Sequence, residues 1–171
     1  MTKFFAALCT VLVALPLLAQ TPETIIHDVQ KDSLVRKGVL KITTKNISSE
    51  TFTMEIKYNI FAKFLFFERT LDGTTSIDLP TKYLSPYGYE ELEEAGSITD
   101  EIATLTHLGR KDLPNHYDCH KVRIKPRKDN KWVGVFTYCP DIPSIGFART
   151  KILMKEIPVV GSHTVHTRIR E

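Results

Sequence analysis

The chain lacks a second long hydrophobic run after its N-terminus, and it lacks a strong excess of one charge. No stretch beyond residue 19 approaches the roughly 20 apolar residues that a membrane-spanning helix needs. The 171 residues hold 23 Lys and Arg against 20 Asp and Glu. Because nucleic-acid binding depends on concentrated positive charge, this balance argues against nucleic acid as a partner. Repeats and low-complexity tracts are also missing, so residues 20–171 are predicted to form a single β-rich domain.

Motifs for common chemistry are missing as well. The sequence has no Gly-x-Ser-x-Gly elbow and no glycine-rich phosphate loop. None of its six histidines has the helical spacing of a zinc protease around a glutamate. The acidic run at residues 90–94 is interpreted as the solvated face of a helix. We therefore expect a non-enzymatic protein with no cofactor and no metal site. A hydrolase that uses His120 or His163 is kept as a third hypothesis.

The N-terminus has the pattern of a secretory signal peptide. Lys3 precedes an uncharged apolar run of about 16 residues, and Ala19 offers a small residue for cleavage. Residues 1–19 are predicted to be the signal peptide, with an uncleaved anchor as the alternative. Lys3 is the only charged residue among them, so their removal lowers the net charge from +3 to +2. The protein is therefore predicted to be secreted or periplasmic, with no transmembrane segment after cleavage.

Only three cysteines are present, and Cys9 lies within the predicted signal peptide. The remaining pair, Cys119 and Cys139, suggests a disulfide in an exported chain. Residues 117–127 and 131–139 have the pattern of two strands joined at residues 128–130. In a hairpin centred on Asp129 the two cysteines lie directly opposite each other, within bonding range for a pair that is not hydrogen-bonded. The disulfide closes a loop of about 20 residues and should stabilise the fold by about 3 kcal/mol.

The same hairpin register separates an apolar face from a basic one. Val122 and Ile124 lie opposite Phe136 and Gly134 on the apolar face, which should pack in the core together with His120. The two cysteines share the other face, which is predicted to meet water. This predicted surface-interaction site is composed of Lys121, Arg123, Lys125, Arg127 and Lys131. Its possible partners are an anionic cell-envelope surface or an acidic protein.

The rest of the chain is predicted to be mainly β. Alternating apolar residues indicate strands over 34–45 and 52–67, and Asp72-Gly73 is a typical hairpin turn. A single short helix is expected over 89–95, ended by Gly96. The predicted fold is an antiparallel meander of about eight strands that forms a barrel, a half-barrel around a helix, or a sandwich. The other predicted strands are 74–79, 101–109, 147–157 and 163–170.

Two aromatic segments are the candidates for ligand contact. The strand over 52–67 keeps its apolar residues in one phase and becomes apolar on both faces toward its end, as a cavity wall would. The tyrosine-rich loop over 79–89 is predicted to be a lid or, equally, a plug for one end of the sheet. Plain core packing is the alternative for the strand. The candidate ligand-binding residues are Tyr58, Ile60, Phe64, Phe66, Tyr83 and Tyr87.

In outline, the chain resembles the periplasmic half-barrel carriers of lipid or lipoprotein. The resemblance rests on export, a length of about 150 residues, long antiparallel strands and one helix, and it implies an apolar ligand. The leading hypothesis is therefore an exported, non-enzymatic binding protein that holds an apolar or amphipathic, lipid-like ligand. The alternative is a cell-envelope interaction or structural module that uses the basic hairpin face.

Overall fold

The computed structural model describes residues 23–128, 131–142, 145–157 and 161–170. The predicted signal peptide lies outside these residues, as does the predicted turn at Asp129 and Asn130. No helix in the described part of the chain is long and apolar enough to cross a membrane.

The described residues are mainly β, as predicted, with ten antiparallel strands in one open sheet and one α-helix. The two strands beyond the predicted eight are β1 and β5, which sequence alternation did not reveal. A closed barrel is excluded because β4 and β5 are the edge strands of the sheet and do not pair with each other. The strands are β1 (Glu23–Val29), β2 (Val35–Lys45), β3 (Thr51–Phe64), β4 (Phe67–Pro80), β5 (Ser97–Thr99), β6 (Ala103–Arg110), β7 (His120–Pro126), β8 (Trp132–Tyr138), β9 (Phe147–Ile157) and β10 (Gly161–Ile169).

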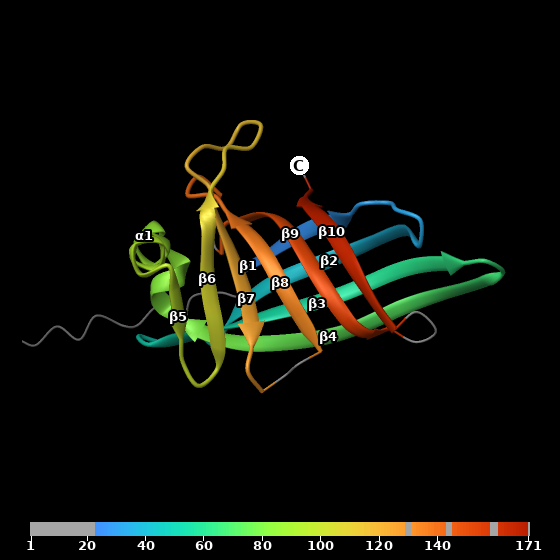
Figure 1. The fold of residues 1–171 in the computed structure, drawn as a ribbon, viewed down its shortest axis with the longest axis horizontal. Helices are drawn as coiled ribbons and strands as arrows, with labels where there is room; N and C mark the ends of the chain where they lie inside the picture. The colour runs from blue at the N-terminus through green and yellow to red at the C-terminus, as the bar shows by residue number, and fades with distance from the viewer. Residues whose placement is uncertain (1–22, 129–130, 143–144, 158–160, 171) are drawn as a thin grey trace, which may run out of the picture.

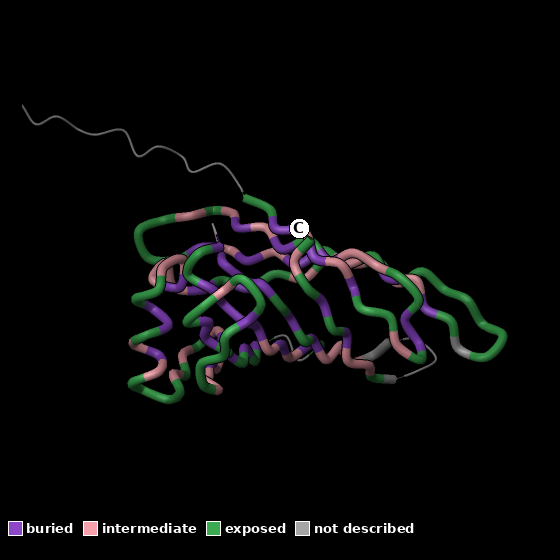
Figure 2. The backbone as a smooth tube through the Cα atoms, turned by 90° about the horizontal axis from the view of Figure 1, so that it is seen from above, coloured by how far each residue is buried: buried purple, intermediate pink, exposed green. Residues whose placement is uncertain are grey.

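The sheet is folded over, so that β6–β10 cross in front of β1–β4 (Figure 1). Its order is β4-β3-β2-β1-β10-β9-β8-β7-β6-β5, which places the first and last strands side by side in the middle. Alternate residues of each strand face inward and form one buried cluster between the two halves. The buried segments accordingly line the inside of the fold in Figure 2.

One end of the fold is covered by a 3₁₀ turn (Thr81–Leu84) and helix α1 (Pro86–Ala95), which ends at Gly96. The predicted helix is confirmed, and its actual start is Pro86. Tyr89 stacks on Tyr138 with ring centroids 3.9 Å apart, and Tyr83 meets Tyr89 edge-on at 5.5 Å. Because Tyr83 and Tyr89 are almost fully buried, this segment packs as a plug at that end of the sheet.

The predicted disulfide is confirmed. Cys119 and Cys139 are bonded with their Cα atoms 4.3 Å apart, and the flanking register pairs His120 with Tyr138 and Ile124 with Gly134, as predicted. The expectation that the cysteines face water is wrong, because both are fully buried. The loops on either side of the hairpin contribute apolar side chains to the same buried cluster, namely Leu113, Ile142 and Ile145.

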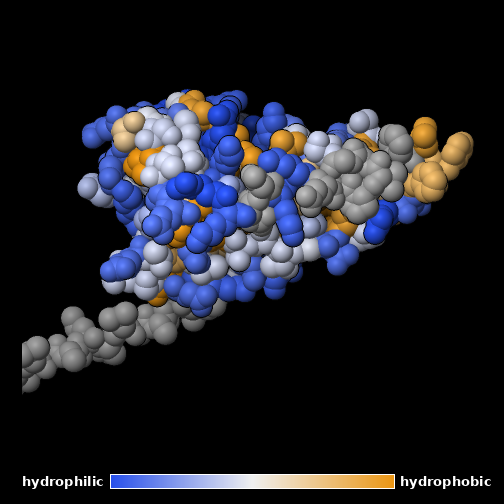
Figure 3. All heavy atoms as spheres, turned by 60° about the horizontal axis from the view of Figure 1, so that its bottom comes forward, coloured by the Kyte–Doolittle hydropathy of each residue, from blue (hydrophilic) through white to orange (hydrophobic). Residues whose placement is uncertain are grey.

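The predicted turn at Asp72-Gly73 is also wrong. Those residues lie within β4, paired with Asn59 and Tyr58, and the chain reverses at Leu65 and Phe66 instead. The Tyr58 ring lies across Gly73, and a Cβ there would lie 2.3 Å from the Tyr58 hydroxyl oxygen, so any other residue at 73 would require the ring to move. The apolar end of the 52–67 segment forms a projecting hairpin tip. Leu65, Phe66 and Phe67 are exposed there, and apolar residues gather at that end in Figure 3.

A buried polar network lies where β1 meets β10. His27 Nδ1 is 3.0 Å from the hydroxyl oxygen of Thr167, which lies 2.7 Å from that of Thr150. All three residues are buried. Burial lowers the pKa of His27 from 6.5 to about 4, and a hydrogen bond with the backbone of Phe147 offsets this only in part. The histidine is therefore neutral in the folded protein at pH 7.

This burial predicts an acid-sensitive fold. The unfolded chain binds the His27 proton more readily, so the stability that this residue contributes is complete above pH 6.5 and is lost as the pH falls toward 4. The loss should reach about 3 kcal/mol. Urea unfolding of His27→Gln should show a weaker pH dependence over this range than the wild type. His166→Gln, at an exposed position on the same sheet, should match the wild type. Parallel pH profiles for wild type and His27→Gln would contradict the assignment.

Candidate functional site

A cavity of about 330 Å³ opens between the two halves of the folded sheet. Strands β2, β3 and β4 form one wall, and β8 and β9 form the other. This volume lies at the low end of the range for small-molecule sites, roughly 300–1,000 Å³. The lining residues are Leu40, Ile56, Tyr58, Gly73, Thr74, Thr75, Lys131, Trp132, Ile152, Met154 and Lys155.

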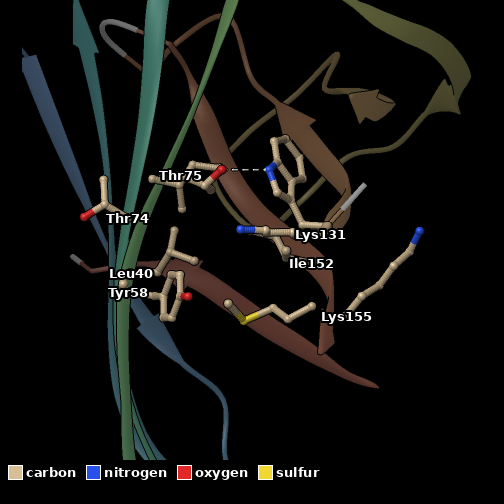
Figure 4. Close-up of a pocket in the computed structure, with 11 residues that line it drawn as sticks. Leu40, Tyr58, Thr74, Thr75, Lys131, Ile152 and Lys155 are labelled. Atoms are coloured by element: carbon tan, nitrogen blue, oxygen red, sulfur yellow. Dashed lines mark hydrogen bonds between the residues drawn. The ribbon is translucent and has the colours of Figure 1, made fainter. Parts of the chain in front are cut away.

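The two walls are joined by a direct hydrogen bond. The Trp132 indole N–H donates to the Thr75 hydroxyl at 3.1 Å, across 57 residues of sequence (Figure 4). Trp132 also meets Phe136 edge-on, with ring centroids 6.2 Å apart. The Trp132 indole is buried, and it has both a hydrogen-bond acceptor and an aromatic neighbour. Trp132 therefore sets the distance between β4 and β8 at this end of the cavity.

The remaining lining is divided by polarity. The apolar floor is composed of inward-facing residues of β2, β3 and β9, and Leu40, Ile56 and Ile152 are buried there. Two cations, Lys131 and Lys155, stand at the opposite side. Figure 4 shows the Lys131 side chain pointing into the cavity, whereas Lys155 points away from it. The backbones are linked, since the Lys155 N–H donates to the Lys131 carbonyl at 2.7 Å.

Tyr58 and Gly73 form the part of the cavity wall next to the apolar floor. They are directly opposite each other on β3 and β4. Because Gly73 has no side chain, the Tyr58 ring lies across it and occupies the space that a Cβ would need. Tyr58 stays half-buried and places a phenol group beside the apolar floor.

The structure does not bring the six predicted ligand-binding residues together. Tyr58 lines the cavity, and Ile60 is buried in the core two residues further along β3. Phe66 is almost fully exposed at the hairpin tip, and the Phe64 side chain lies outside the described residues. Tyr83 belongs to the plug at the far end, where burial raises its pKa to about 12. Tyr87 is exposed on α1.

The predicted basic residues are also divided between two places. Lys121, Arg123 and Lys125 are exposed along the outer face of β7. Arg127 is exposed beyond the strand and donates to the Asp100 carbonyl at 2.8 Å. Lys131 is exposed as well, and it also lines the cavity. The cavity residues Trp132, Ile152 and Met154 were not predicted, because alternation indicates burial and does not distinguish a cavity wall from a packed core.

The outer basic face extends further than β7. Arg123 is in register with Val135 and Lys151, and Lys121 is in register with Thr137 and Arg149. On β10, Arg168 lies opposite Arg149. The only acidic residue in the sequences of β7 to β10 is Glu156, near the end of β9. We call the residues Lys121, Arg123, Lys125, Arg149, Lys151 and Arg168 the basic band.

Comparisons with protein-family models, with curated proteins and with solved structures find no match for the chain. Its function is therefore inferred from its own residues.

Proposed function

We propose that the protein is an exported, non-enzymatic binding protein that holds an amphipathic ligand with one apolar chain and an acidic head in the cavity between the sheet halves. The observation that carries this proposal is the lining: a buried aliphatic floor with one inward-pointing ammonium group. An apolar chain would cover Leu40, Ile56 and Ile152, and a carboxylate would meet Lys131. The disulfide supports an oxidising compartment, as expected for an exported chain.

The size of the cavity restricts the ligand further. About 330 Å³ suits one apolar chain or part of one, and it is small for a lipid with two complete chains. The Trp132–Thr75 hydrogen bond closes one side. We therefore expect a fatty acid or another singly acylated molecule.

Filling the cavity tests this function directly. Met154→Trp adds bulk at a half-buried cavity residue, whereas Leu153→Trp adds the same bulk to the next residue of β9, on the opposite face of the strand. Fluorescent fatty acid should bind the wild type and Leu153→Trp, and Met154→Trp should bind at least about tenfold more weakly, since burial of a few methylene groups contributes that much. A ligand-free mass in native mass spectrometry, together with no fatty-acid binding by the wild type, would refute the proposal.

The head group is tested by charge. Lys131→Glu should weaken the binding of a fatty acid by about tenfold or more and leave the binding of its methyl ester nearly unchanged, because only the acid carries a charge. Lys41→Glu makes the same charge change at an exposed position on β2 and should affect neither ligand. If Lys131→Glu weakened both ligands equally, the lysine would not be the head-group contact.

The second candidate function is that of a cell-envelope interaction or structural module. The basic band favours it, because its six cations lie on β7, β9 and β10, and Glu156 is the only acidic residue in the sequences of β7 to β10. Exposed single charges contribute little, but a band of one sign attracts an anionic surface. The Val135 side chain, half-buried between the cations, adds an apolar element to the same face.

Charge reversal separates this candidate from the first. The triple variant Lys121→Glu, Arg123→Glu and Lys125→Glu should lose association with anionic envelope vesicles while it still binds fatty acid. Reversal of Lys31, Lys41 and Lys111, which are exposed elsewhere, gives the same net charge and should leave vesicle association largely intact. Equal vesicle binding by both triple variants would remove the basic band as the contact surface.

A further inference from the structure

Three potential ligand side chains converge beside the plug, away from the cavity. Glu93 belongs to α1, His107 to β6 and His120 to β7. The His107 Nε2 and His120 Nδ1 atoms are 3.1 Å apart. One ligand atom from each of the three residues lies within 4.8 Å of the other two. No sequence spacing predicted this cluster, because the residues come from three separate elements.

The fold explains why they meet. His107 is paired with Val122, two residues from His120, so the two imidazoles are diagonal neighbours on one face of the β6–β7 pair. Tyr89, one helical turn before Glu93, stacks on Tyr138, which is the cross-strand partner of His120. The same aromatic contact that docks α1 therefore holds Glu93 beside the two imidazoles.

The nitrogen separation is close to that of two ligands on one metal ion. Two imidazole nitrogens at about 2.0–2.1 Å from a tetrahedral zinc ion lie about 3.3 Å apart. The 3.1 Å between His107 Nε2 and His120 Nδ1 is therefore compatible with both nitrogens binding one zinc ion. Nitrogen ligands favour zinc and similar transition metals over calcium and magnesium.

Arg110 already contacts the carboxylate from the outside. Its Nη2 and Nε donate to Glu93 Oε2 at 2.6 and 2.9 Å, whereas Oε1 has only a longer contact of 3.2 Å. Oε1 is thus the oxygen available to a metal, and Arg110 would hold the carboxylate in place, as outer hydrogen-bond partners of metal ligands do. The positive charge of Arg110 also opposes a cation, so the affinity should be moderate.

One local rearrangement is required. The Gly109 N–H donates to His107 Nδ1 at 3.3 Å. Coordination through Nε2 of neutral His107 moves its proton to Nδ1, so this amide must turn away. Gly109 has a φ of 101° and lies at a register shift between β6 and β7. A glycine at an irregular strand end allows that change at low cost.

We propose that Glu93, His107 and His120 form a binding site for a divalent transition-metal ion, best suited to zinc, with the fourth position open to water. The two histidines and the carboxylate supply three protein ligands from three elements. The bound ion would cross-link α1 to the β6–β7 pair. The site is separate from the cavity, so the proposal stands whether or not the cavity binds an acyl chain.

Metal titration of the full-length protein, after removal of bound metal with a chelator, provides the test. Zinc should bind at one ion per chain and raise the thermal unfolding temperature. Cobalt should give the visible absorption of a four-coordinate site. His107→Gln, at a half-buried position where the amide can still donate to His120, should bind at least tenfold more weakly and lose the cobalt spectrum. Glu93→Gln, at a more exposed position, should weaken zinc in the same direction.

His163→Gln is the matched control, because His163 Nε2 also lies beside a carboxylate, 2.8 Å from Asp32 Oδ2, but without a second histidine. It should bind zinc as the wild type does. Equal zinc affinity of the wild type, His107→Gln and Glu93→Gln would overturn the proposal and indicate adventitious binding elsewhere. Absence of zinc binding by the wild type would overturn it as well.

Discussion

The pairing of the first strand with the last is the constraint on which the rest of the structure depends. Only three residue pairs define it, His27 with Ile169, Asp28 with Arg168 and Val29 with Thr167. They join a four-stranded N-terminal half to a six-stranded C-terminal half. On the inner side, hydrogen bonds link His27 to Thr167 and Thr167 to Thr150. On the outer side, Arg170 donates to Asp28 and keeps the pKa of that carboxyl below its usual value.

Because the sheet folds over at this pairing, its two halves enclose a common interior. Because the two halves are continuous through β1 and β10, their inward faces are opposed rather than independent, and Trp132 reaches Thr75 from the other half. The core fills most of the space, and the cavity remains where Gly73 and the half-buried Met154 and Tyr58 leave the packing incomplete. At the opposite end, Tyr83, Tyr89 and Leu92 complete the core and exclude water. The cavity and the plug are thus separate parts of one interior.

Parts of this arrangement could be predicted from residues alone. The Cys119–Cys139 hairpin was correct because two unrelated constraints, cysteine position and side-chain polarity, require the same register. The strand from Phe52 to Ala62 was correct because its burial alternates strictly. The turn at Asp72-Gly73 was wrong because a local turn preference competed with a tertiary need, space for the Tyr58 ring. Local composition cannot distinguish these two uses of glycine.

The candidate sites were harder to predict, because cross-strand register over irregular loops decides them. His107 and His120 are separated by the irregular connection over residues 111–118, so their proximity could not be counted along the chain. A hint was nevertheless present, since His120 shares its face with Val122 and Ile124, where a polar ring requires a partner. Hairpin alternation correctly predicted that Lys131 is exposed, but it did not show that the side chain also lines the cavity, because Lys131 lies one residue before β8 begins.

The contact between Gly73 and Tyr58 affects how easily substitutions can change the shape of the cavity. The ring lies over a residue without a side chain, so this pair of positions sets the cavity wall at this point. A smaller residue at 58 would enlarge the cavity, and any side chain at 73 would force the ring to move. Neither position belongs to the pairing of β1 with β10 or to the disulfide. The cavity can therefore change shape here without a change in the contacts that hold the two halves of the sheet together.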